Sequence, residues 1–266
     1  MPRIQVEPSV SLHVQDVGSG PPVALLHGWA LSHEVWDRQV RALAEEGRRV
    51  LAFDLRGHGS SDAPFGDYSV ARLGADVTTV LESLDVADAA LVGWSLGGLV
   101  AFRVAATHPK LVRRLVLVGS NGVANARKPG YPFGLPAEEQ EQAVVEREKA
   151  DRISSRRDLI LGAFNSPPED VLADWLLGVS LRTPSWVGVE CLRTLMRTDQ
   201  VDHLAELDMS VVQILGSRDP ILAKRGSAWL KEQLRDCRHV WLENCGHFPM
   251  LEAPDSFDHA LVESIT

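Results

Sequence analysis

The first half of the chain contains the stretch Leu91-Val92-Gly93-Trp94-Ser95-Leu96-Gly97-Gly98, in which a serine stands between two glycines directly after a short apolar run. A serine hydroxyl is a poor nucleophile at neutral pH, so a protein that uses one exposes its oxygen and places a base beside it. The Gly-x-Ser-x-Gly spacing predicts a sharp turn between a strand and a helix, because larger side chains at Gly93 and Gly97 would collide with the neighbouring chain. Ser95 is therefore the candidate nucleophile.

Short apolar runs alternate with helical patterns on both sides of this stretch. Six runs are typical of strands buried on both faces, as in a parallel sheet: residues 23–26, 50–53, 89–92, 115–118, 211–215 and 239–242. Four segments between them carry apolar residues at helical steps and are predicted to be crossover helices: residues 72–84, 96–107, 224–234 and 255–265. The pattern predicts an α/β fold with a mostly parallel sheet. Ligands bind such sheets at the carboxyl ends of the strands, so the chemistry is expected in the loops there.

Residues 121–209 interrupt this alternation, because they contain helical stretches and proline-containing loops but no strand-like run. We therefore predict a core of residues 1–120 and 210–266 and a helical cap insertion of residues 121–209. The insertion follows the end of a strand, so part of it is expected to cover an apolar pocket above Ser95. The residues expected to line that pocket are Trp94, Phe164, Trp175 and Trp186.

The apolar faces of two helices in the insertion are further candidates for this pocket, although most of their side chains are expected to pack inside the insertion. The first face carries Val171, Leu172, Trp175, Leu176 and Val179, and the second carries Val189, Leu192, Leu195 and Met196. The charged stretch 138–157 is expected to be a solvated helix face.

The motif His27-Gly28-Trp29 directly follows the run at residues 23–26. Acyl transfer creates an oxyanion, which must be met by preorganised donors, usually two backbone N–H groups. Leu96, the residue after the nucleophile, is expected to supply one of them. Trp29 is expected to supply the other, because Gly28 allows the loop to turn back toward Ser95. His27 is expected to be structural and to bond its own loop.

Chain order selects the base and the acid, because proteins with a nucleophile turn of this kind place serine first, the acid next and histidine last. Asp219 follows the run at residues 211–215, and His247 follows the run at residues 239–242. Both are expected at carboxyl ends of neighbouring strands. His108, His203, His239 and His259 lie in helical or strand-like positions that fit this role less well.

Composition narrows the class of protein. A chain of 266 residues with 45% hydrophobic and 24% charged residues is expected to be a soluble globular protein. The net charge of −9 and the scattered basic residues argue against nucleic acid and anionic membranes as partners. The three cysteines match neither a disulfide framework nor a zinc site, and no apolar signal core follows the N-terminus, so a cytoplasmic location is expected. A small uncharged molecule is the expected substrate.

Together these motifs resemble the α/β-hydrolases along the whole chain except the insertion. The resemblance covers His27-Gly28-Trp29, the segment Asp54-Leu55-Arg56-Gly57-His58-Gly59-Ser60-Ser61-Asp62, the serine turn, Asp219-Pro220 and Gly246-His247. It implies an α/β-hydrolase fold in which Ser95 is the nucleophile, Asp219 the acid and His247 the base. Arg56 and His58 would then shape a loop rather than take part in the reaction.

Within that family the chain resembles several groups: carboxylesterases, pimeloyl-acyl-carrier-protein methyl ester esterases, 3-oxoadipate enol-lactonases and cofactor-free haloperoxidases. These groups disagree about the substrate. Arg127, Lys128, Arg152, Arg156 and Arg157 could form a basic rim for an acidic acyl carrier protein, but nearby glutamates offset them and an ordinary solvated surface is the favoured interpretation.

The expected function is hydrolysis of a small or medium-chain carboxylic ester or lactone through an acyl-enzyme, without metal or organic cofactor. Two alternatives stay open. One is a receptor-like protein of the same fold that hydrolyses its ligand slowly or only once, and the other is a perhydrolase or haloperoxidase activity in the same site. Substrate and oligomeric state are not determined by the sequence.

Overall fold

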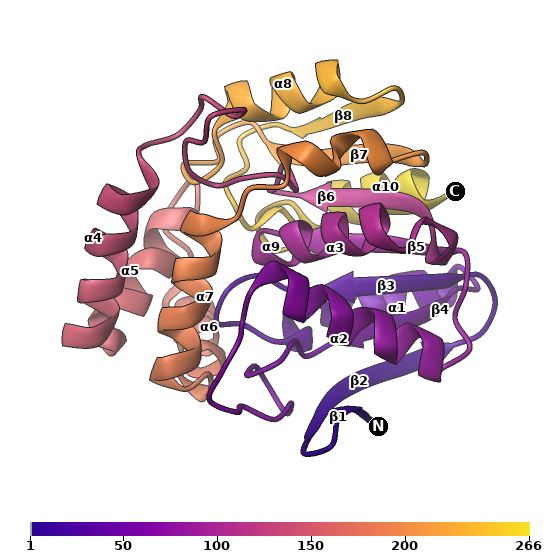
Figure 1. Ribbon diagram of the computed structural model, residues 1–266, viewed down its shortest axis with the longest axis horizontal. Helices are drawn as coiled ribbons and strands as arrows, with labels where there is room; N and C mark the ends of the chain where they lie inside the picture. Colours follow the sequence, from indigo (N-terminus) through magenta and orange to yellow (C-terminus); the bar gives the residue numbers. More distant parts are fainter. Residues whose placement is uncertain (1) are drawn as a thin grey trace.

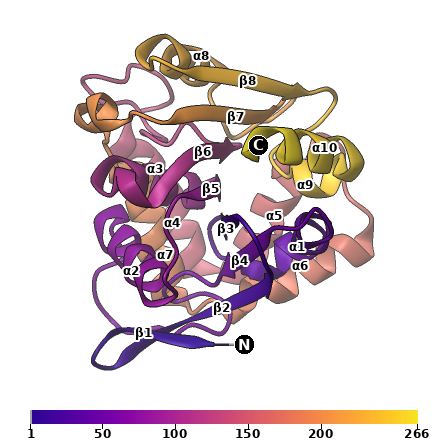
Figure 2. The same ribbon diagram turned by 90° about the vertical axis from the view of Figure 1, so that its right-hand side faces the viewer.

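Eight strands form a single sheet in the order β1-β2-β4-β3-β5-β6-β7-β8 in the computed structural model, which describes residues 2–266 (Figures 1 and 2). The strands are β1 (Arg3–Glu7), β2 (Val10–Gly18), β3 (Pro22–Leu26), β4 (Arg49–Phe53), β5 (Ala89–Trp94), β6 (Val112–Val118), β7 (Ser210–Gly216) and β8 (Cys237–Leu242). β1 pairs antiparallel with β2 and β2 antiparallel with β4, and all other neighbours are parallel. The predicted mostly parallel sheet flanked by helices is confirmed.

Helices cover both faces of the sheet (Figure 2). One face packs against α2 (Val70–Ser83), α3 (Leu96–Thr107) and α8 (Lys224–Gln233), and the other against α1 (Asp37–Glu45) and α10 (Pro254–Ile265). Neighbouring residues of a strand point to opposite faces, so Val23 and Leu25 join one core while Ala24 and Leu26 join the other. Because both faces of the central strands are buried, β3 and β5 are apolar throughout.

The segment between β6 and β7 contains four α-helices and no strand, and we call residues 121–209 the cap segment. Its helices are α4 (Ala137–Ala150), α5 (Arg152–Ala163), α6 (Asp170–Arg182) and α7 (Ser185–Arg197). They lie together beyond the carboxyl ends of the strands, at the left of Figure 1. The remaining short helices are η1 (His33–Trp36), η2 (Pro109–Leu111), η3 (Val201–Glu206) and α9 (Pro249–Glu252).

Besides the short helices, the apolar-run pattern missed β1, β2 and α1. β2 alternates buried and partly exposed residues, with Val10, Leu12 and Val14 inside, because it lies near the sheet edge and one of its faces is only partly covered. Helix α1 buries only Gln39, Val40 and Leu43. Within residues 2–266, no helix is both long and apolar enough to cross a bilayer.

Candidate active site

Ser95 lies at the turn between β5 and α3, as the Gly-x-Ser-x-Gly spacing predicts. Its backbone has φ 55° and ψ −117°, and its side chain is only partly buried. A Cβ at Gly93 would lie 2.2 Å from the carbonyl oxygen of Gly97, and a Cβ at Gly97 would lie 2.4 Å from that of Leu26. The two glycines therefore allow the strand and the helix to approach closely enough to hold Ser95 in its left-handed conformation.

The structure brings Ser95, His247 and Asp219 together in one line of hydrogen bonds. The Nε2 atom of His247 lies 3.0 Å from the Oγ atom of Ser95, and its Nδ1 atom lies 2.8 Å from the Oδ2 atom of Asp219. Asp219 follows β7 and His247 follows β8, so the three residues come from the same edge of the sheet. This arrangement allows the imidazole to accept the serine proton while the carboxylate holds the ring.

The surroundings of Asp219 favour the ionised form of its carboxyl group. Its Oδ1 atom accepts the backbone N–H groups of Ile221 and Leu222 at 2.8 and 3.0 Å, which leaves Oδ2 for the ring of His247. Burial alone would raise the pKa of this carboxyl, but attraction to His247 and hydrogen bonds from its ring and from the two amides outweigh burial and lower the pKa. An ionised Asp219 keeps the proton of the neutral ring on Nδ1, which leaves the Nε2 lone pair facing Ser95.

The backbone of His247 is fixed on several sides. Its N–H donates to the carbonyl oxygen of Ala163 at 2.8 Å, and its own carbonyl accepts Nε1–H of Trp94 at 2.7 Å. The carboxylate of Glu252 accepts the N–H groups of Gly246 and Phe248, on either side of His247, at 2.9 and 3.1 Å. The imidazole is therefore held by the core, by α9 and by the end of α5.

The loop after β3 brings Trp29 close to the serine turn. A Cβ at Gly28 would lie 2.8 Å from the ring of Trp94 and 3.2 Å from the Cβ of Ser95, so only glycine allows this approach. His27 bonds its own loop, as expected, with Nδ1–H donating to the Gly28 carbonyl at 2.7 Å. Within the described residues, the N–H groups of Trp29 and Leu96 donate to no other group of the chain. N–H groups without an acceptor in the folded chain are the kind of donor that an oxyanion hole requires.

A cavity of about 690 Å³ opens at Ser95 between the sheet edge and the cap segment. Among the residues that the structure describes, the ionisable side chains that line it are those of Glu139 and His247. Most of its wall is apolar, formed by Leu31, Trp94, Leu135, Val144, Leu159, Ile160, Leu192, Leu195, Met196, Ile221, Leu222 and Phe248. Three residues of the predicted α7 face, Leu192, Leu195 and Met196, thus reach the cavity.

Of the four residues expected to line the pocket, only Trp94 does so. Phe164 is buried behind the wall, where it stacks on Phe248 at a centroid distance of 4.6 Å. Trp175 is 38% exposed and lies beside a separate surface cavity next to His33. Trp186 is also 38% exposed and stacks on Phe65 on the outer surface. The predictions for Phe164, Trp175 and Trp186 are therefore corrected: helical periodicity shows which residues share a face but not what that face meets.

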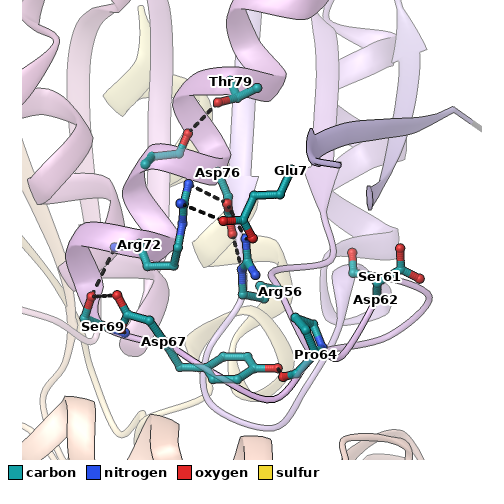
Figure 3. A network of polar contacts seen from close by, with 12 residues as sticks. Glu7, Arg56, Ser61, Asp62, Pro64, Asp67, Ser69, Arg72, Asp76 and Thr79 are labelled. Carbon is teal, nitrogen blue, oxygen red and sulfur yellow. Dashed lines mark hydrogen bonds and ion pairs between the residues drawn. The ribbon is translucent and has the colours of Figure 1, made fainter. Parts of the chain in front are cut away.

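Arg56 and His58, which were expected to shape the Asp54–Asp62 loop, make contacts that hold this loop in place. The guanidinium of Arg56 bonds both carboxylate oxygens of Asp76 in α2, at 2.6 and 2.9 Å, and Glu7 in β1 at 2.6 Å (Figure 3). His58 is fully buried and accepts the N–H of Ala30, the residue after Trp29, at 3.2 Å. These contacts join the loop to the sheet edge and to the Trp29 loop.

The proposed basic rim loses its central member, because Arg156 is fully buried. Arg157 pairs with Asp174 at 3.0 Å, and the ammonium of Lys128 donates to the carbonyl oxygens of Met196 and Arg197. The interpretation of these residues as a solvated surface was also wrong for Arg156. Its side chain is buried and pairs with the buried Glu148 of the neighbouring helix.

One cluster of side chains has the composition of a metal site. Nitrogen and oxygen atoms of His13, His33 and Asp54 lie within 4.8 Å of one another. The two rings and the N–H groups of His33 and Ser60 already donate to the carboxylate of Asp54. Every lone pair of that carboxylate therefore has a donor, and we interpret the cluster as an anchor for the loop rather than as a metal site.

Comparison with known proteins identifies the family. The profile described as alpha/beta hydrolase fold matches residues 21–254, and the chain belongs to this family. It is 31% identical to a pimeloyl-(acyl-carrier protein) methyl ester esterase of Nitrosomonas europaea, over 93% of this chain and 96% of the relative. It is 30% identical to a non-heme haloperoxidase of Rhodococcus erythropolis, over 86% and 85%. An esterase from Exiguobacterium antarcticum superposes with a TM-score of 0.94 at 28% identity, over 99% and 98% of the two chains.

Proposed function

We propose that this protein is a serine hydrolase that cleaves neutral carboxylic esters, or lactones, through an acyl-enzyme. The observation that carries the proposal is the line of hydrogen bonds in which His247 lies 3.0 Å from Ser95 and 2.8 Å from Asp219. The esterases among the relatives support the same reaction class.

In the proposed mechanism His247 takes the proton of Ser95 as the oxygen attacks the ester carbonyl, and Asp219 stabilises the imidazolium. The amides of Trp29 and Leu96 bind the oxyanion, aided by the positive end of the α3 dipole. The alcohol leaves with the proton from His247. Water then attacks the acyl-enzyme by the same route in reverse.

The cavity supports an apolar, uncharged acyl group. A volume of about 690 Å³ accommodates a medium-length chain. In residues 2–266, no lysine or arginine lines the cavity and could pair with a carboxylate. A charged acyl terminus would have to be buried without a partner, which costs several kcal/mol by order of magnitude. We expect p-nitrophenyl hexanoate to be hydrolysed about 10²-fold faster, in kcat/KM, than the ester with a terminal carboxylate at the same length.

The direct test is Ser95→Ala in a series of p-nitrophenyl esters of increasing chain length. Turnover should fall by about 10⁴ to 10⁶, as for other serine triads. Activity of the parent should also fall at acid pH, because a protonated imidazole accepts no proton. A Ser95→Ala protein with near-parental turnover would refute the proposal, and a single burst of product without steady turnover would favour the receptor-like alternative.

Perhydrolysis is a second candidate, favoured by the haloperoxidase relative. Hydrogen peroxide would replace water in the attack on the acyl-enzyme and release a peracid. The test measures how the acyl-enzyme divides between water and hydrogen peroxide. Peracid formation from an acetate ester and peroxide must require Ser95, and it must reduce the amount of acetate formed by hydrolysis.

The similarity to a pimeloyl-(acyl-carrier protein) methyl ester esterase favours an acyl carrier protein as a second kind of partner. Arg156 is buried and the ammonium of Lys128 already donates to two carbonyl oxygens, so such a carrier would have to dock on the other three members of the predicted rim, Arg127, Arg152 and Arg157. Tighter binding of a carrier-linked substrate at low salt, lost in an Arg152→Ala/Arg157→Ala double variant, would support it.

A further inference from the structure

A buried ion pair joins all four helices of the cap segment. Arg156 of α5 and Glu148 of α4 are both almost fully buried, with Nε and Nη2 of the arginine 3.0 and 2.5 Å from Oε1 of the glutamate. Nη1 of Arg156 donates to the carbonyl oxygens of Ser180 in α6 and of Thr183 in the turn before α7. One guanidinium therefore fixes how these helices meet.

The same guanidinium also contacts the loop that contains Trp29. Its Cζ atom lies 5.4 Å from the centre of the Trp29 ring, a cation–π distance. Nε1–H of that ring donates to the carbonyl oxygen of Gly188 in α7 at 2.9 Å. A Cβ at Gly188 would lie 2.5 Å from Nη2 of Arg156 and 2.7 Å from Oε1 of Glu148, so the ion pair packs directly against the backbone of the residue that accepts the indole N–H. The indole is thus held at its face and at its edge by the cap segment.

Stability alone does not account for this ion pair. Buried pairs can often be replaced by apolar side chains without loss of stability, since desolvation offsets their attraction. Oε2 of Glu148 is, moreover, a buried acceptor with no donor in the described part of the chain, which costs free energy. What the pair does provide is a fixed orientation for the groups it touches.

We propose that Arg156 and Glu148 are positioning residues that hold the amide of Trp29 in the oxyanion hole through its indole ring. The inference rests on the proposed function, because that amide matters only if an oxyanion forms at Ser95. It makes the cap segment part of the catalytic geometry, in addition to its role as the wall of the acyl cavity.

The expected effect falls on the transition state. Loss of a whole oxyanion donor costs about 10² to 10³ in kcat, and a loosened donor should cost less, about 10- to 100-fold. KM should change less than about threefold, because the ground-state carbonyl makes little use of the donor.

The test compares Arg156→Met and Glu148→Gln with Arg147→Met, which changes an exposed arginine of α4, one residue before Glu148. Steady-state kcat and KM are measured for p-nitrophenyl butyrate. Binding affinity is measured for a trifluoromethyl ketone, which forms an oxyanion adduct with the serine, and for the alcohol of the same carbon skeleton, which has no carbonyl and forms no adduct. The two buried variants should lose kcat and trifluoromethyl ketone affinity by the same factor and keep the affinity for the alcohol. Arg147→Met should match the parent.

Trp29→Phe provides a second route if Arg156→Met does not fold. It keeps a ring beside the guanidinium but removes the bond to Gly188, so it should show the same selective loss, and combining it with Glu148→Gln should add little. Folded Glu148→Gln and Trp29→Phe proteins with parental kcat and ketone affinity would overturn the inference. A parent that forms no ketone adduct, or an active Ser95→Ala protein, would instead refute the proposed function.

Discussion

Ser95 occupies a backbone conformation that residues with side chains rarely adopt, and such strain costs about 1–3 kcal/mol. The surrounding bonds impose this conformation. Its N–H donates to the carbonyl oxygen of Val118 at 3.0 Å, and its carbonyl accepts the N–H of Gly98 at 2.9 Å. The close approach of Gly97 to Leu26 holds the start of α3 against the strand that leads to the Trp29 loop.

Gly97→Ala should therefore disable the site. The new Cβ would meet the backbone oxygens of Leu26 and His27 at 2.4 and 2.6 Å, and neither can move away without shifting the Trp29 loop. A displacement of this size at a reacting group is expected to lower kcat/KM by about 10²-fold. Ester hydrolysis measures it, with Gly178→Ala in α6 as the control. The Cβ at position 178 meets nothing within 4 Å, so that change should leave activity intact and stabilise the helix by about 1 kcal/mol.

Two buried histidines make the fold sensitive to acid. His27 and His58 each donate from Nδ1 to a carbonyl oxygen and accept a backbone N–H at Nε2, from Leu55 and Ala30 respectively. A proton on Nε2 would face another N–H group. Burial lowers the pKa of His27 to about 4 and that of His58 to about 3, from 6.5. Both rings are therefore neutral in the folded protein at pH values where the unfolded chain is protonated.

The free energy of unfolding should consequently fall as the pH drops below 6.5. Above that pH neither state binds the protons, and below it only the unfolded state does, until the pH reaches about 4 for His27 and about 3 for His58. Each histidine contributes at most about 1.4 kcal/mol per pH unit in its window. Urea unfolding across this range measures the slope. His58→Gln should reduce it, whereas His259→Gln on the exposed face of α10 should not; equal slopes in all three proteins would contradict the assignment.

At the scale of elements, hydrogen bonds to α9 hold the loop that carries His247. The carboxylate of Glu252 accepts the N–H groups of Gly246 and Phe248, and also that of Asn165 in the cap segment at 2.9 Å. It is a single side chain that holds the base and joins the cap segment to the core.

Glu252→Gln should loosen this loop with little change in shape. An amide offers one acceptor oxygen in place of two and brings an N–H group against another N–H group. Hydrogen bonds to charged groups contribute about 1.5–3 kcal/mol, so Tm should fall by roughly 3–10 °C. We expect kcat to fall about tenfold, because His247 is less well held. Thermal unfolding measures Tm, and ester hydrolysis measures kcat. Glu263→Gln, on the exposed face of α10, should change neither.

The elements differ in how far the sequence predicted them. The apolar runs identified six parallel strands, five of them largely buried on both faces and the sixth, β8, at the partly exposed edge of the sheet. The ends of three of these runs located Ser95, Asp219 and His247. The α7 face reaches the cavity as predicted. Of the predicted α6 face, Leu176 and Val179 are buried, whereas Val171 is 74% exposed and Trp175 lies beside a separate surface cavity. Periodicity within a helix cannot report which neighbour the helix meets. The burial of Arg156 likewise depends on Glu148, on another helix, and no local pattern pairs the two.

At the scale of the whole molecule, a common strand direction brings distant residues together. Trp29, Ser95, Asp219 and His247 follow four parallel strands, and all four strands end at one edge of the sheet. The antiparallel strands β1 and β2 lie at the far side of this sheet. Arg56 joins β1 to α2 there through Glu7 and Asp76, in the network of Figure 3.

Arg56→Met should therefore lower stability and spare the reaction. Asp76 is 1% exposed and would keep only the partly exposed Arg72 as its cationic partner, at 3.0 Å. Removing one partner of a buried ion pair costs about 3–5 kcal/mol, which corresponds to a fall in Tm of roughly 6–15 °C. Arg56→Met/Asp76→Leu should regain part of that loss, because no buried charge is left alone. Arg41→Met, which breaks the exposed pair with Glu45, should cost less than about 1 kcal/mol. Well below Tm, kcat should stay within about threefold of the parent, since Arg56 acts on the fold; a large loss of kcat in a protein of unchanged Tm would place Arg56 in the reaction instead.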